Sequence, residues 1–98
     1  MLTTSGMAAK KLKEQLIYKL RDVGIGFRVN INTDESGKLV FSIKLDMQRK
    51  GDKVIESDGI NIFLDRTSAL KVEGYKLDYQ DEPGGGFFLS TMQEVTGG

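Results

Sequence analysis

The sequence predicts an α+β fold that is mostly β, with one N-terminal helix followed by a run of short strands. Apolar residues first recur at spacings of three and four, which is the period of an amphipathic helix. After residue 26 the period changes to two, which is typical of strands. Only one short helical segment interrupts the strands, so an antiparallel or mixed sheet is expected.

The first expected element is a helix between Ser5 and Gly24. Serine is favoured at helix N-caps, and glycine is favoured just after the last helical turn. The helix would bury one apolar stripe and leave a basic face in solvent. The stripe consists of Ala9, Leu12, Leu16, Leu20 and Val23.

Two alternating runs follow the helix. In residues 27–31 the apolar side chains alternate with polar ones, among them Arg28, which predicts a strand buried on one face only. Residues 39–47 show the same alternation over a longer stretch and give the clearest strand pattern in the chain. The polar segment 32–38 between them is expected to be a turn.

A β-hairpin is predicted next. Residues 54–57 and 60–65 resemble paired strands, and Asp58-Gly59 between them suits the two positive-φ positions of a type I′ turn. A short helical turn ending at Gly74 should follow.

The last third of the chain predicts two further segments. Leu77 and Tyr79 suggest a short strand, on which Tyr75 and Tyr79 share one face and are expected to pack in the core or at its rim. The segment 81–86 is expected to be a flexible loop, and 87–91 is a last apolar segment.

Length and charge limit the possible classes of protein. The 98 residues are expected to form a single domain, 1–98, with a flexible tail over 91–98. Fourteen basic residues balance fourteen acidic ones, which argues against a dedicated nucleic-acid-binding protein. No apolar run reaches the length of a membrane span, and no secretory pattern opens the chain, so we expect no membrane partner and a cytoplasmic location.

The composition also excludes several kinds of active site. The chain contains no cysteine and no histidine, which rules out thiolate nucleophiles, thiolate or imidazole metal sites and Ser-His-Asp triads. No pair of carboxylate, lysine or tyrosine side chains is placed for general acid–base work. We therefore expect a protein that is not an enzyme and has no catalytic residues.

Two glycine-rich segments resemble phosphate-binding motifs only superficially. Gly24-Ile25-Gly26 opens like a dinucleotide fingerprint, but Val29 stands at the third glycine position and a strand follows instead of a helix. Gly84-Gly85-Gly86 has no following lysine and hydroxyl residue, so a mobile loop is expected there.

Acidic residues are the remaining candidates for metal binding. Asp34 and Glu35 lie in one turn, and Asp78, Asp81 and Glu82 lie late in the chain. Carboxylates are hard ligands that suit Mg²⁺, Ca²⁺ and Mn²⁺ and can contact iron. No EF-hand spacing is present, and adjacent surface acids are usually only solvated. Binding of iron or another divalent ion by carboxylates stays open as an alternative function. The carboxylates could belong to one chain or be shared across a dimer.

Five segments follow one another over nearly the full length of the chain: "AAKKLKEQL", "GIGFRVNI", "GDKVIESDGINIFLD", "SALKVEGYKLDY" and "GGGFFL". In this order they resemble the HesB-like family, the A-type (IscA-like) carriers of iron–sulfur cluster assembly. The resemblance implies an N-terminal helix packed on short strands that form two small sheets. It also implies that the central hairpin is scaffold.

The resemblance further implies three cysteine ligands, none of which is present here. Glu35, within "DESGK", stands where the first cysteine is expected, and a Cys-Gly-Cys pair has no counterpart because the chain ends in "TGG". A carboxylate replaces a thiolate poorly on cluster iron, so no iron–sulfur cofactor is expected. Glu35, with Asp34 beside it, is the metal-ligand candidate.

The resulting prediction is a divergent, cysteine-less HesB-like protein with a non-catalytic accessory or protein-binding role, linked to iron–sulfur cluster assembly by family analogy. Its protein partners are not identified by the sequence. A homodimer is expected, because short antiparallel sheets leave unpaired edges.

Overall fold

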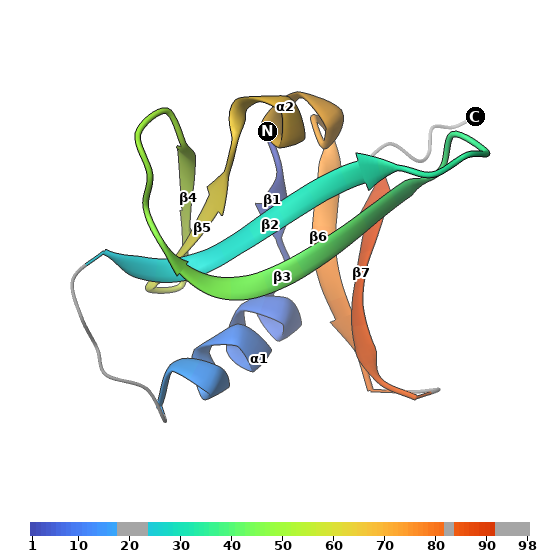
Figure 1. Ribbon diagram of the computed structural model, residues 1–98. Coiled ribbons are helices and arrows are strands. Elements are labelled where there is room, and N and C mark those ends of the chain that lie inside the picture. Colours follow the sequence, from blue (N-terminus) through green and yellow to red (C-terminus); the bar gives the residue numbers. More distant parts are fainter. Residues whose placement is uncertain (18–23, 82–83, 92–98) are drawn as a thin grey trace.

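The computed structural model describes residues 1–17, 24–81 and 84–91. These residues form two small sheets with a helix at one end of the space between them (Figure 1). In chain order the elements are β1 (Thr3–Thr4), α1 (Gly6–Ile17), β2 (Ile25–Thr33), β3 (Leu39–Met47), β4 (Lys53–Ser57), β5 (Ile60–Leu64), α2 (Arg66–Lys71), β6 (Tyr75–Gln80) and β7 (Gly86–Thr91). Among them, no helix is long and apolar enough to cross a membrane.

The predicted α+β class and the two mixed sheets are confirmed. The larger sheet has the order β3-β2-β5-β4, and the smaller has the order β1-β6-β7. The β2–β5 and β1–β6 pairs are parallel, and the other neighbours are antiparallel. Strand β1 was not predicted. It has two residues, too few for any periodicity, and it exists because Thr3 and Thr4 pair with Lys76 and Leu77.

Helix α1 begins where the sequence predicted. Ser5 is its N-cap: the Ser5 hydroxyl oxygen accepts the backbone N–H of Ala8 at 3.1 Å and donates to a carboxylate oxygen of Asp78 at 2.6 Å. The same side chain therefore caps α1 and ties the helix to β6. Of the predicted stripe, Ala9 and Leu12 are fully buried.

The rest of the predicted helix cannot be compared with the structure. Leu20 and Val23 of the predicted stripe lie outside the described residues, as do the other residues between 18 and 23.

The hairpin and its turn are confirmed. Asp58 and Gly59 have φ angles of 51° and 85°, as a type I′ turn requires. Strand β5 ends at Leu64, one residue earlier than predicted, because Asp65 is the N-cap of α2 and its carboxylate accepts the N–H of Ser68 at 2.7 Å. The predicted helical turn is α2, and the last apolar segment is β7.

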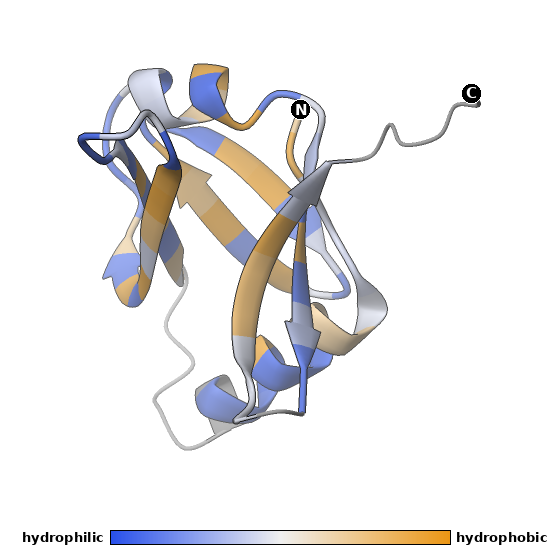
Figure 2. Cartoon of the chain, turned by 90° about the vertical axis from the view of Figure 1, so that its right-hand side faces the viewer, coloured by the Kyte–Doolittle hydropathy of each residue, from blue (hydrophilic) through white to orange (hydrophobic). Residues whose placement is uncertain are grey.

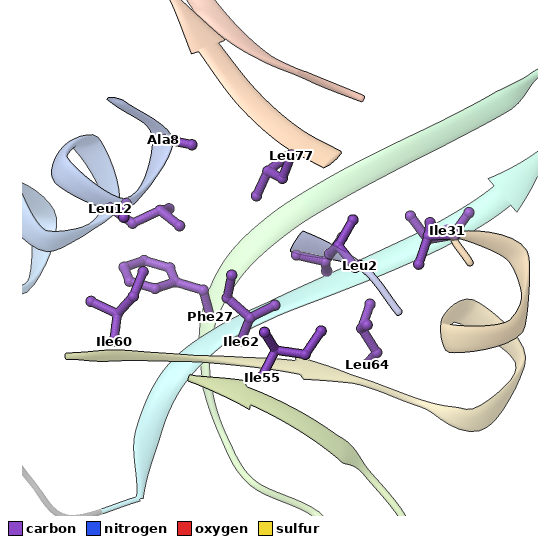
Figure 3. Close-up of a cluster of buried hydrophobic side chains, with 13 residues drawn as sticks. Leu2, Ala8, Leu12, Phe27, Ile31, Ile55, Ile60, Ile62, Leu64 and Leu77 are labelled. Atoms are coloured by element: carbon purple, nitrogen blue, oxygen red, sulfur yellow. The ribbon is translucent and has the colours of Figure 1, made fainter. Parts of the chain in front are cut away.

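The hydrophobic core lies between the two sheets and against α1 (Figure 3). Hydrophobic residues lie mainly on the strands, whereas the connecting turns are mainly hydrophilic (Figure 2). The core comprises Leu2, Ala8, Ala9, Leu12, Phe27, Val29, Ile31, Ile55, Ile60, Ile62, Leu64, Val72 and Leu77. Tyr75 and Tyr79 are half-buried and pack against it, as predicted, and Tyr79 meets Phe87 edge-on with ring centroids 5.0 Å apart.

Strand β2 corrects the prediction of a strand buried on one face only. Arg28, expected in solvent, is 3% exposed. Its guanidinium binds Asp52 through two bonds of 3.0 and 2.7 Å and Asp46 through its Nε at 2.6 Å. Asp52 lies in the connection from β3 to β4, which covers this outer face of β2. The neighbouring Phe63 is also fully buried, with Arg28 5.8 Å from its ring centroid.

Helix α2 is fastened to β2 by one buried hydroxyl. Ser68 is 2% exposed, and its oxygen accepts the N–H of Ile31 at 3.0 Å.

Replacing Ser68 by Ala would leave that N–H buried without an acceptor, so we expect the free energy of unfolding to fall by about 2 kcal/mol. Urea unfolding followed by circular dichroism measures this loss. Thr67→Ala, at an exposed position of the same helix, is the control and should change stability by less than about 0.5 kcal/mol.

Candidate functional site

The turn between β2 and β3 holds both predicted metal ligands, and it is organised around Asp34. One carboxylate oxygen of Asp34 accepts the N–H groups of Ser36 and Lys38, each at 2.9 Å, and the Ser36 hydroxyl at 2.8 Å. The Lys38 N–H, followed by the Ser36 hydroxyl, lowers the pKa of Asp34. Asp34 therefore stays ionised and already serves as the acceptor that closes its own turn. Glu35 is exposed beside it.

The other acidic candidates do not join this turn. The Asp78 carboxylate accepts the Ser5 hydroxyl and the Tyr79 N–H. Asp81 is 65% exposed and lies 3.9 Å from the ammonium nitrogen of Lys11. Glu82 lies outside the described residues. The β2–β3 turn lies at the upper right of Figure 1, whereas β6 ends at the lower right, just before Asp81.

Within residues 1–17, 24–81 and 84–91, no three acidic side chains lie close enough together to hold a metal ion. The assignment of Glu35 and Asp34 as metal ligands stays a prediction. These two carboxylates could still bind an ion together with ligands from a second chain.

A hollow of about 340 Å³ opens next to this turn. The turn and the start of β3 form one wall, and residues from the facing sheet form the other. The lining residues are Gly37, Lys38, Leu39, Phe41, Tyr75 and Leu89. The lining is mixed: Leu39, Phe41 and Leu89 are apolar, whereas Lys38 and Tyr75 carry polar groups. The sequence did not predict the hollow, because its two walls come from residues about 35 to 50 positions apart in the chain, in different sheets.

The glycine-rich segments have structural roles. Gly26 lies in β2 and is followed by strand, so no helix N-terminus faces a phosphate there. A Cβ atom on Gly26 would lie 2.5 Å from the carbonyl oxygen of Asn61 and 2.9 Å from the Phe63 ring. Residues 84–86 likewise lead into strand β7.

The ion cluster around Arg28 was missed by the sequence interpretation. It includes Arg49, whose guanidinium lies 3.0 Å from the Asp46 carboxylate. The backbone N–H of Arg49 donates to the Asp52 carboxylate at 2.7 Å. The Arg28 guanidinium is the main cause that lowers the pKa of both Asp46 and Asp52, so both are ionised at neutral pH. All charges in the cluster are paired, and the cluster is structural. The sequence signal that could have revealed this cluster is the pair of acids, Asp46 and Asp52, on either side of "MQRKG".

Comparison with solved structures identifies the fold, although no family model and no curated protein sequence matches the chain. SufA from Escherichia coli, involved in the biosynthesis of iron–sulfur clusters, superposes with a TM-score of 0.77 at 20% identity, over 98% of this chain and 86% of SufA. IscA with its [2Fe-2S] cluster gives 0.75 at 19% identity, over 93% and 85% of the two chains.

A protein from Aquifex aeolicus, studied by solution NMR, gives a TM-score of 0.61 at 22% identity, over 92% of this chain and 90% of that protein. The chain therefore has the SufA and IscA fold over nearly its whole length, and the fold that the resemblance implied is confirmed. At these identities the likeness concerns the fold.

Proposed function

We propose that this chain is a divergent HesB-like protein that acts in iron–sulfur cluster assembly as a non-catalytic accessory, through contacts with other proteins, and not as a cluster carrier. The observation that supports it is the SufA fold extending over 98% of a chain that has no cysteine. We place the protein in the cytoplasm and propose that it self-associates.

The donor set argues against cluster binding. Iron–sulfur clusters are held by cysteine thiolates, with histidine replacing some of them in Rieske centres, and this chain has neither residue. Glu35 offers a single hard oxygen donor group in an exposed turn, and its neighbour Asp34 is engaged by the turn itself. The residues present therefore do not fit an iron–sulfur cluster.

Anaerobic incubation with ferrous iron and sulfide tests this proposal. After desalting, we expect no cluster absorbance and no stoichiometric iron, with E. coli SufA as the positive control. Stoichiometric iron that disappears in Glu35→Ala would instead support the carboxylate site. Cluster absorbance from the unmodified chain would contradict the proposal.

The accessory role is tested separately by titrating the chain into SufA and following binding by calorimetry. We expect a saturable heat of binding. Absence of binding to both the cluster-loaded and the cluster-free form of SufA would argue against contact with this class of carrier.

A further inference from the structure

Strand β3 is the longest unpaired edge in the described part of the chain. All nine residues, Leu39–Met47, pair on one side with β2. On its other side no described element pairs with it, because β3 ends the sheet order β3-β2-β5-β4 (Figure 1). The opposite edge of that sheet, β4, contacts β1 of the smaller sheet. Unpaired N–H and C=O groups along such an edge can bind a further strand.

The apolar face of β3 is incompletely covered. Leu39, Phe41, Ile43 and Leu45 pack against the core but stay half-exposed, and Met47 at the strand end is 51% exposed. Leu39 and Phe41 also line the hollow at the start of the strand. One end of β3 thus borders a hollow, and the other end carries a flexible, exposed apolar side chain, Met47.

Charge differs in sign between the two ends of β3. Before the strand, Asp34 and Glu35 outnumber Lys38. After it, Lys50 is exposed and adds a positive charge, whereas Arg28 and Arg49 together balance Asp46 and Asp52. A strand that is acidic at one end and basic at the other is complementary to an antiparallel copy of itself.

We infer that β3 pairs antiparallel with β3 of a second copy of this chain, joining the two larger sheets into one. The inference rests on the self-association proposed above and assigns its interface. In the register centred on Ile43, all nine residues of each strand are paired, and the apolar faces lie on the same side. Leu39 then lies opposite Met47 of the second copy, so that Met47 of each copy covers the hollow of the other.

Polar residues favour the same register. Centring on Ile43 places Ser42 opposite Lys44 of the second copy, whereas centring on Lys44 would place the two lysines directly opposite each other. Like charges facing each other across paired strands are destabilising. The acidic turn of one copy, at Asp34 and Glu35, also approaches Lys50 of the other.

The test introduces a positive or a negative charge at one exposed position, Ser42. Ser42→Lys puts a lysine opposite Lys44 twice, by symmetry, and should weaken dimerisation about tenfold. Ser42→Glu puts a carboxylate at the same two places and should tighten it about tenfold. Thr67→Lys, at an exposed position of α2, is the matched control and should leave the dissociation constant unchanged. Sedimentation equilibrium on the full parent chain and on the three variants gives the four dissociation constants.

Amide hydrogen exchange locates the interface independently, because amides along the outer edge of β3 should gain protection as protein concentration rises. A dimer that ignores both Ser42 variants, or protects another element, overturns the β3 interface and leaves self-association standing. A chain that remains monomeric up to about 1 mM overturns both. Neither result bears on SufA binding or on iron uptake.

Discussion

Replacing Asp52 by Ala is expected to lower the free energy of unfolding by about 3–5 kcal/mol. The Arg28 and Asp52 side chains are only 4% and 3% exposed, and they are joined by two hydrogen bonds. Removing the carboxylate leaves a buried guanidinium with two of its four hydrogen bonds, those to Asp46 and to the backbone carbonyl of Met47, and neither acceptor can replace the two lost bonds. It also frees the β3–β4 connection, whose Arg49 N–H binds Asp52.

Urea unfolding monitored by circular dichroism measures this effect. Asp81→Ala removes an equal charge from an exposed side chain with one long ion contact, and should cost less than about 0.5 kcal/mol. Because breaking a buried pair costs more than replacing it, Arg28→Met combined with Asp52→Leu should be less destabilised than Asp52→Ala. Equal stability of Asp52→Ala and the parent chain would show that the pair contributes nothing.

The same ion cluster makes stability depend on pH in a definite direction. The pKa values of Asp46 and Asp52 are lowered in the folded chain, mainly by Arg28, relative to about 3.9 in the unfolded chain. Their stabilisation is therefore present above about pH 4 and is lost as the pH falls through the lowered pKa values. The free energy of unfolding of the parent chain should therefore exceed that of Asp52→Ala by less at about pH 3 than at about pH 6. A difference that is constant with pH would contradict the assignment.

Replacing Gly26 by Ala is expected to cost about 3 kcal/mol, the upper part of the range for overpacked sites. The added Cβ would lie 2.5 Å from the Asn61 carbonyl oxygen, well inside any normal contact distance. Because that oxygen belongs to the backbone of β5, the clash can be relieved only by moving β2 and β5 apart, and the Phe63 ring at 2.9 Å hinders that movement.

Gly6→Ala is the matched control for this substitution. Gly6 opens α1, its added Cβ meets nothing within 4 Å, and its φ is negative, so alanine there should be neutral or stabilise by up to about 1 kcal/mol. Thermal unfolding of both variants compares them under identical conditions. If Gly26→Ala unfolds within about 2 °C of the parent chain, the close approach of β2 and β5 is not a constraint on this position.

Local chemistry allowed most of the elements to be predicted. The Ser5 cap, the Asp58-Gly59 turn and the alternation in 39–47 each depend on residues within one element, so their signals are complete in the sequence. The absence of cysteine is equally explicit, and it excludes thiolate ligation whatever the fold. Glu35 as a metal ligand remains a prediction from the sequence.

Contacts between distant residues decided the rest. Arg28 is buried because Asp52, 24 residues later, folds over the outer face of β2, and no periodicity within β2 contains that information. The two-residue β1 exists only through β6, more than 70 residues away. The hollow beside the Glu35 turn, and the free edge of β3, arise from the order in which strands meet in the two sheets. Alternation shows which face of a strand is apolar, whereas which neighbours cover that face depends on the long-range packing of the whole chain.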